Sequence, residues 1–284
     1  MKPTYETIIL KNSQYTLQLY VDYFNKRLRV DDYRGNINNI VQELNQLMEH
    51  YNFTKLIFFT RTEHWQHLLS KGFQLEGMIN GYFSGSDNFI MTAYTEDERR
   101  QSTTWLEEDA IINAIEKKGR KVDDMQLFPQ YKYRKATTND ASALAQLYGN
   151  VFSIYPTPMN NPQYVIKMMN SGTNFYVVES GSQLVSAASA EINGTYHNAE
   201  LTDCATLPEH RKYGLMKKLL VQLEHDLQRD GIYCAFSLAR AQSYGMNAAL
   251  FQLGYQYKGR LTNNCYIFNN KLEDMNVWVK DLSL

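Results

Sequence analysis

The chain contains few cysteines and no long apolar run. Its three cysteines, Cys204, Cys234 and Cys265, form no CxxC pair, which excludes a disulfide framework and indicates reduced core thiols instead of metal ligands. No apolar stretch is long enough to span a membrane, and the start MKPTYETIIL lacks the layout of a signal peptide. We therefore expect a cytoplasmic protein that has no membrane partner and no metal site.

A strong charge of either sign is also missing. The 29 basic and 30 acidic residues give a formal net charge of -1, so no global basic field predicts binding to nucleic acid. Hydrophobic residues make up 44% of the 284 positions. This is enough core material for two modest domains or one large domain.

The chain is organised around residues 199–230. A segment suited to a strand turns at Pro208, passes through the basic residues 210–212 and reaches Gly214 before a helix. The helix is predicted from leucines that recur on one stripe, Leu215, Leu219, Leu220, Leu223 and Leu227. This arrangement directs unpaired N–H groups and positive charge toward an anion. The alternative is that a basic strand–turn–helix needs no ligand.

Hydrophobic patterns predict further elements on both sides of a linker at residues 120–129. Before it we expect strands at 7–10, 15–24, 55–59 and 89–94 and helices at 37–48, 64–70 and 105–118. After it we expect a strand at 133–136, helices to about 152 and at 162–169, a hairpin at 175–179 and 183–192, a strand at 232–238, a helix at 246–253, and two closing strands around Tyr255 and Cys265. The domain boundary is placed between residues 1–125 and 126–284.

The segment Pro208-Glu209-His210-Arg211-Lys212-Tyr213-Gly214 resembles the acetyl-CoA loop of the GNAT superfamily of N-acetyltransferases. Arg211 and Gly214 match its Gln/Arg-x-x-Gly-x-Gly/Ala pattern, whereas Met216 departs from it. The element order after residue 131 and the pair Met246-Asn247 with Leu253-Gly254-Tyr255 are also similar to this superfamily. The resemblance implies an α/β (α+β) GNAT fold, in which a central mixed twisted sheet is flanked by helices.

The same resemblance implies acetyl-CoA as co-substrate. Its arm would lie between the strands at 201–206 and 232–238. The residues implied to bind it are Cys204, Ala205, Thr206, Arg211, Lys212, Tyr213, Gly214, Leu215, Met216 and Asn247. For Asn247, capping or decorating the helix is an equally weighted alternative.

Acetyl transfer to an amine requires that the amine lose a proton. An alkyl amine with a pKa near ~10.4 is neutral about once in ~10³ molecules at pH 7, so a base contributes several kcal/mol. The candidates are Asp203, Glu200 and Glu191. Because Glu200 and Asp203 are three residues apart, we expect them on opposite faces, and Asp203 is preferred because it is nearer the expected thioester. Leu250 replaces the tyrosine that often protonates the thiolate; Tyr244 is a substitute candidate, with core packing as the alternative.

The first part of the chain repeats features of the second. The segment 71–77, KGFQLEG, parallels 253–259, LGYQYKG, and Tyr33-Arg34-Gly35 precedes a long helical stripe. We interpret residues 1 to about 100 as a degenerate half of the same fold, with chance similarity as the alternative. Asp31 and Asp32 would repel phosphate, so this half is expected to bind no coenzyme, and to cover the edge of the other sheet or shape the acceptor site.

Several segments together resemble the β-lysine N6-acetyltransferase family: 203–206 (DCAT), 237–241 (SLARA), 259–264 (GRLTNN) and Val151-Phe152-x-x-Tyr155-Pro156. This implies acetylation of the terminal amine of β-lysine to the compatible solute N6-acetyl-β-lysine. The candidate substrate residues are Tyr155, Glu191, Arg240 and Asn263, of which Arg240 would pair with the carboxylate. Alternatives are a surface ion pair for Arg240, a packed ring for Tyr155, another small amine or a protein lysine as acceptor, and an acyl-CoA sensor without turnover. A homodimer is possible.

Overall fold

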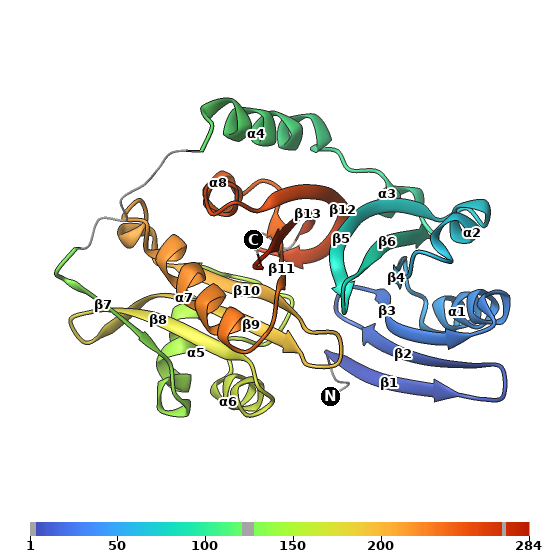
Figure 1. The fold of residues 1–284 in the computed structure, drawn as a ribbon, viewed down its shortest axis with the longest axis horizontal. Helices are drawn as coiled ribbons and strands as arrows, with labels where there is room; N and C mark the ends of the chain where they lie inside the picture. Colours follow the sequence, from blue (N-terminus) through green and yellow to red (C-terminus); the bar gives the residue numbers. More distant parts are fainter. Residues whose placement is uncertain (1–3, 121–127, 269–270, 284) are drawn as a thin grey trace.

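The computed structural model describes residues 4–120, 128–268 and 271–283, and within these ranges thirteen strands form one twisted sheet (Figure 1). Its strand order is β1-β2-β3-β4-β6-β5-β12-β13-β11-β10-β9-β8-β7. The two parts of the chain therefore occupy the two ends of a single sheet. We call residues 4–94 the N-terminal half and residues 131–283 the C-terminal half. The predicted boundary at 125/126 lies outside the described residues.

The N-terminal half contains β1 Tyr5–Lys11, β2 Tyr15–Asp22, β3 Arg27–Gly35, α1 Ile37–Tyr51, β4 Lys55–Thr60, α2 Trp65–Ser70, β5 Gln74–Phe83 and β6 Ser86–Tyr94. Helix α1 begins where the Asn36 side chain accepts hydrogen bonds from two backbone N–H groups of its first turn. Its buried face packs in a core with β2, β3 and β4. Two further helices, α3 Asp97–Arg100 and α4 Trp105–Lys118, lead toward the C-terminal half, where α4 contacts α8.

The C-terminal half contains β7 Tyr131–Lys135, a 3₁₀ turn Thr138–Asp140, α5 Ala141–Val151, α6 Pro162–Asn170, β8 Asn174–Ser180, β9 Gln183–Asn193, β10 Asn198–Thr206, a 3₁₀ turn Pro208–His210, α7 Leu215–Arg229, β11 Cys234–Arg240, α8 Tyr244–Gln252, β12 Gln256–Ile267 and β13 Lys271–Asp281. Helix α7 covers one face of β8–β10, and α5 covers the opposite face (Figure 1). The predicted leucine stripe of α7 is buried there.

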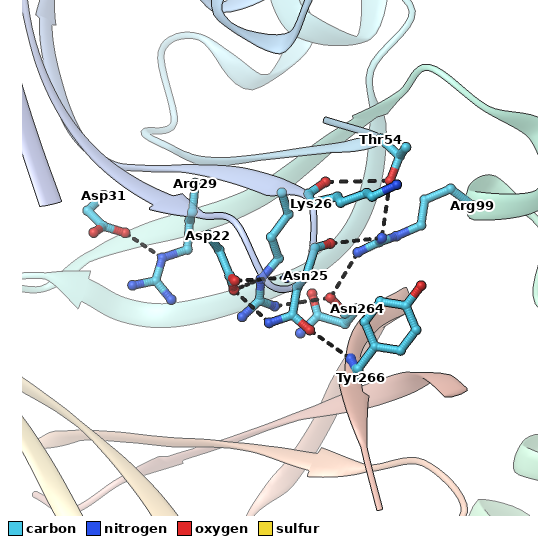
Figure 2. A network of polar contacts seen from close by, with 10 residues as sticks. Asp22, Asn25, Lys26, Arg29, Asp31, Thr54, Arg99, Asn264 and Tyr266 are labelled. Carbon is cyan, nitrogen blue, oxygen red and sulfur yellow. Dashed lines mark hydrogen bonds and ion pairs between the residues drawn. The ribbon is translucent and has the colours of Figure 1, made fainter. Parts of the chain in front are cut away.

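The halves meet where β5 pairs with β12, and in this pairing Gly77 lies opposite Gly259. Apolar side chains of both halves share a core at this junction, including Ile79, Phe236 and Val277. A polar network lies beside that core (Figure 2). The buried Arg99 guanidinium donates to the carbonyls of Asn25 at 2.9 Å and Asn264 at 3.2 Å, so one cation joins backbone from both halves. The N-terminal half thus lies at the edge of the C-terminal sheet, as predicted.

The N-terminal half repeats the order strand–strand–strand–helix–strand–helix–strand–strand seen from β8 to β13. Its parallel strands β3 and β4 pair only as far as Val30 and Phe58. Beyond that point Arg61 occupies the space: its Nη1 donates to the Tyr33 carbonyl at 3.0 Å, and its Nη2 donates to Asp32 at 2.6 Å. Side chains therefore fill the crevice that corresponds to the parting of β10 and β11.

Several predicted elements are found, but some strands were missed. Strands β3 and β5 were not predicted as separate strands, and Tyr255 and Cys265 do not mark two strands. Cys265 lies in β12, Tyr255 precedes it, and the last strand is β13. The helix predicted to run to about residue 152 is found as α5, which ends at Val151 and follows a capping box between Thr137 and Asp140. Among the helices in the described ranges, none is both long enough and apolar enough to cross a bilayer.

Candidate active site

Strands β10 and β11 run parallel and then part. Their register ends at Glu200 opposite Phe236, whereas β10 stays paired with β9 to Thr206 and β11 with β13 to Arg240. Because the outer neighbours hold both strands in the sheet, an opening forms between their carboxyl ends. Backbone groups on both sides of this opening lack a ladder partner across it, so they suit an extended ligand that lies along a strand.

A β-bulge in β10 forms one wall of the opening. The register with β9 shifts between Thr202 and Ala205, and Asp203 has a left-handed φ of 50°. The Asp203 carboxylate accepts a 2.7 Å hydrogen bond from Ser189 Oγ on β9. Ser189 and Glu191 are two residues apart, so their side chains point to the same face of β9. Glu191 lies opposite Glu200 of β10. The prediction that Glu200 and Asp203 face opposite sides is therefore wrong, because the bulge turns Asp203 toward the face of Glu200.

Asp203 is buried and holds two tyrosines. The Tyr155 hydroxyl donates to its carboxylate at 3.1 Å, and the Tyr148 hydroxyl donates to its carbonyl oxygen at 2.7 Å. Burial raises the pKa of the Asp203 carboxyl, while the hydrogen bonds from Ser189 and Tyr155 lower it. These contacts contradict the alternative that Tyr155 is only a packed ring, because its hydroxyl is hydrogen-bonded to the Asp203 carboxylate.

The opening continues into a cleft of about 980 Å³. The predicted coenzyme residues that line it are Cys204, Thr206, Arg211, Lys212, Tyr213, Gly214, Leu215 and Met216. Gly214 has a φ of 68° and is the N-cap of α7, so the first N–H groups of a 15-residue helix lie at the cleft wall. Arg211 and Lys212 are exposed beside them. The predicted anion-binding loop is thus part of the cleft, whereas Ala205 is buried behind its wall.

Asn247 does not reach the cleft. Its side chain is fully buried, donates to the carbonyls of Arg240 and Ser243, and accepts hydrogen bonds from Asn276 and Trp278. The coenzyme contact implied for Asn247 is therefore corrected: the residue fastens α8 to β11 and β13. Leu250 is also fully buried and packs in the core of the C-terminal half.

Two candidate substrate residues already have partners. The Arg240 guanidinium forms two hydrogen bonds of 2.7 and 2.8 Å with Glu273 and lies over the Phe268 ring. Arg240 lines the cleft, but the two guanidinium nitrogens that could bind a carboxylate together already bind Glu273. The Asn263 amide donates to the carbonyls of Glu98, Arg99 and Gln101. Asn263 thus joins β12 to α3 and is not among the residues that line the cleft.

Tyr244 lines the cleft and is not a core residue. It is 38% exposed, and Lys118 Nζ donates to its hydroxyl at 2.7 Å. The core-packing alternative for Tyr244 is therefore wrong. Lys118 was missed from the sequence because it belongs to α4, whose docking on α8 no local pattern predicts.

Glu191 and Glu200 form a second group of carboxylates on the Asp203 face. Burial raises the pKa of Glu191 to about 8, and the charges of Asp203 and Glu200 add to the effect. Burial raises the pKa of Glu200 to about 7, the nearby cation Arg29 lowers it, and Asp203 raises it. Glu191 is nevertheless exposed and Glu200 half-buried. Arg29 is a residue of the N-terminal half that sequence analysis did not connect with the site.

Comparison with known proteins identifies the family. A family model of the acetyltransferase (GNAT) domain matches residues 132–247. The N-acetyltransferase YodP of Bacillus subtilis is 42% identical over 274 residues, covering 96% of this chain and 98% of the relative. The β-lysine N6-acetyltransferase of Methanosarcina mazei is 35% identical over 271 residues, 88% of this chain and 100% of the relative. The chain belongs to the β-lysine N6-acetyltransferase family of the GNAT superfamily.

A solved structure from Salmonella typhimurium with its cofactor acetyl-CoA is also similar, with 17% identity and a TM-score of 0.46, covering 54% of this chain and 94% of that one. Membership in this family confirms the predicted GNAT fold, with a mixed sheet between layers of helices. The chain is an acetyl-CoA-dependent N-acetyltransferase. In this acetyltransferase family member, the parted strands, the bulge and the loop before α7 belong to one cleft.

Proposed function

We propose that the protein transfers the acetyl group of acetyl-CoA to the terminal amine of β-lysine and forms N6-acetyl-β-lysine. The observation that carries this proposal is the 35% identity, over the full length of the relative, to a β-lysine N6-acetyltransferase. The site supports it, because Tyr155 and the Asp203 carboxylate that it contacts lie at the cleft, where an amine could lose its proton. A product of this kind would serve as a compatible solute under osmotic stress.

The cleft residues fit acetyl-CoA. Exposed Arg211 and Lys212, together with the N–H groups at the start of α7, would hold the pyrophosphate. Gly214 leaves room for this: a Cβ added there would meet only the flexible end of Lys217, at 3.8 Å. Free backbone groups near Cys204 and Thr206 would pair with the pantetheine arm. The coenzyme supplies an acetyl thioester, which an amine nitrogen attacks.

We propose Tyr155 and Asp203 as the pair that removes the amine proton. Tyr155 lines the cleft and its hydroxyl donates to the buried carboxylate, so a proton taken up by the tyrosine oxygen can be balanced by transfer of its own proton to Asp203. A carboxyl whose pKa is raised by burial is a better proton acceptor than an ordinary aspartate. Tyr244 is the proposed proton donor to the departing sulfur.

We further infer a catalytic unit that begins near residue 126, preceded by a degenerate GNAT-like unit. The three free cysteines and the small polar acceptor agree with a cytoplasmic enzyme that has no nucleic-acid or membrane partner. A homodimer remains part of the proposal, and sedimentation of the purified enzyme tests it.

A panel of amines tests the substrate. Purified enzyme with acetyl-CoA is mixed with β-lysine, other small diamines and lysine-containing peptides, and thiol release is followed. We expect the highest kcat/KM with β-lysine and a product acetylated at N6 by mass spectrometry. Preference for peptides would refute β-lysine as the acceptor. Coenzyme binding by calorimetry without acetylation of any amine would instead identify an acyl-CoA sensor.

A further inference from the structure

Phe268 directly follows β12 and lines the cleft. Its φ of 66° lies in the left-handed region, which a bulky side chain rarely adopts. Backbone strain of this kind persists only where the surrounding contacts hold it, and it is typical of positions that clamp a functional segment.

The backbone of Phe268 holds the start of the loop between α5 and α6. Its N–H donates to the Ile154 carbonyl at 2.9 Å, and its carbonyl oxygen accepts a hydrogen bond from Ser153 Oγ. The next residue of the loop is Tyr155, whose hydroxyl donates to the Asp203 carboxylate. Phe268 therefore fixes the main chain immediately before the tyrosine of the proposed proton-accepting pair.

The ring of Phe268 packs against an ion pair at the end of β11. The Arg240 guanidinium carbon lies 4.4 Å from the ring centroid, and Arg240 Nε and Nη2 donate to Glu273 of β13 at 2.7 and 2.8 Å. Two parallel hydrogen bonds fix the plane of a guanidinium, so Arg240 offers the ring a fixed surface. We call Phe268, Arg240 and Glu273 the Phe268 cluster.

Apolar side chains extend the wall that the Phe268 cluster forms. Ile267, which precedes Phe268 in the chain, lines the cleft, and so does Phe152. The Phe152 ring packs against Tyr155 with centroids 4.8 Å apart. A wall of this composition suits the methylene chain of an amine better than a carboxylate.

We propose that the Phe268 cluster positions Tyr155 for proton transfer and forms the wall along which the carbon chain of the acceptor amine lies. Arg240 then acts through Phe268 and is not the ligand of a carboxylate. This inference rests on the proposed role of Tyr155 and Asp203. It requires no particular acceptor, because the Phe268 cluster holds the loop and not a charged group of the substrate.

Removal of the ring tests the positioning role. Phe268→Asn keeps a residue that readily adopts a left-handed φ and loses the ring. With β-lysine, or the best acceptor of the amine panel, kcat should fall about 10- to 100-fold, because a shift of about 1 Å in a catalytic group has an effect of this size. KM for acetyl-CoA should stay within about twofold. Phe268→Tyr, which keeps the ring, should retain wild-type kinetics.

Phe24→Asn is the matched control. Phe24 is an aromatic residue in the turn between β2 and β3, is 38% exposed and is not among the residues that line the cleft. Its replacement should leave kcat unchanged. Equal kcat for Phe24→Asn and Phe268→Asn would overturn the inference.

A double variant separates positioning from general support of the fold. Tyr155→Phe/Phe268→Asn should have the kcat of Tyr155→Phe within about twofold, because both changes act through one hydroxyl. Multiplied losses would show that the Phe268 cluster does not act through Tyr155, and would overturn the inference.

Arg240→Lys distinguishes the two roles of Arg240. Lysine keeps the positive charge but cannot bind Glu273 through two nitrogens, so kcat should fall between those of wild type and Phe268→Asn. The loss should be equal for β-lysine and for 1,4-diaminopentane, which is β-lysine without its carboxylate. A loss confined to β-lysine would assign Arg240 to the substrate carboxylate and would contradict the positioning role.

Hydrogen exchange gives a readout that does not depend on turnover. The amide of residue 268 donates to the Ile154 carbonyl, so its protection factor should fall about tenfold in Phe268→Asn and stay unchanged in Phe24→Asn. Unchanged protection in both variants would overturn the inference. If the wild-type enzyme acetylates no amine of the panel, the proposed function is refuted, and the protection factor alone decides whether the Phe268 cluster holds the loop.

Discussion

Gly77 and Gly259 lie opposite each other in the register that joins β5 to β12. They occupy corresponding positions of the repeated segments 71–77 and 253–259, so equivalent strands of the two halves meet at equivalent glycines. The approach is close: a Cβ added to Gly259 would lie 2.2 Å from the Glu76 carbonyl oxygen and 2.5 Å from the Gly77 Cα. The repeated glycine in the sequence thus marks the contact between the halves.

The first prediction concerns this contact. Gly259→Ala should lower the free energy of unfolding by about 3 kcal/mol or more, because Gly259 has a φ of 137° and its new methyl group would meet backbone. Urea denaturation of the purified variant measures the loss. Gly194→Ala, where a Cβ meets nothing within 4 Å and φ is not positive, is the control. A stability equal to that of the control would show that the junction can move apart without cost.

The second prediction concerns the loop before α7. Gly214→Asp should raise KM for acetyl-CoA about tenfold or more, because it places a negative charge where the helix N-terminus favours an anion. Gly231→Asp is the matched control: Gly231 follows the other end of α7, has a similar φ of 72° and also has open space for a Cβ. Both variants should lose similar stability. If steady-state kinetics show the same KM for the two variants, the loop does not hold the coenzyme.

The third prediction tests the proton-accepting pair. Tyr155→Phe should lower kcat about 100-fold at neutral pH, because the hydroxyl that links the amine to Asp203 is lost, while KM for acetyl-CoA should stay within about twofold. Tyr176 lies on β8 and is not among the residues that line the cleft, and its hydroxyl donates to Asp226 of α7 at 3.0 Å. Tyr176→Phe should therefore keep wild-type kinetics. A pH–rate profile of Tyr155→Phe identical to that of wild type would exclude the tyrosine from proton transfer.

The fourth prediction follows from the raised pKa values of Glu191, about 8, and Glu200, about 7. Between their unfolded value near 4.5 and these values, the folded protein binds more protons than the unfolded chain. Their contribution to stability is therefore fully present below pH 4.5 and is lost as pH rises through 7 to 8. The double variant Glu191→Gln/Glu200→Gln should show a smaller fall in Tm between pH 5 and 8.5 than wild type.

Calorimetric scans across this range measure the effect, with Glu209→Gln as control because Glu209 is exposed in the turn before α7. An unchanged slope for the double variant would mean that the fold does not hold these carboxyls protonated.

Local patterns predicted much of the C-terminal half. The leucine stripe of α7, the turn at Pro208 and the glycine at the helix start are all short-range features, and the structure confirms them together at the cleft. The position of Asn247 shows the limit of this approach. Its spacing from Gly254 resembled a coenzyme contact, but the Trp278 and Asn276 side chains that bury it come from the last strand.

The site features that were missed depend on contacts between distant segments. The bulge at Asp203 shifts the in–out alternation of β10 by one residue, and none of the residue types at 202–205 predicts a bulge. Strand β5 was missed because glycines at 77 and 81 interrupt its apolar alternation. The effect of Arg29 on Glu200 could not be predicted, because only the joining of the two halves lets the charge of Arg29 act on that carboxyl.

Arg61 and Tyr33 fill the crevice of the N-terminal half, and this has a consequence for how the enzyme can diversify. With its own opening occupied, that half is not required to preserve a nucleotide pocket. Changes on its strands can accumulate while the thioester chemistry of the other half stays constant. The half without an opening can thus vary more freely than the half that holds the cleft, and natural sequence variation among relatives should concentrate in the first.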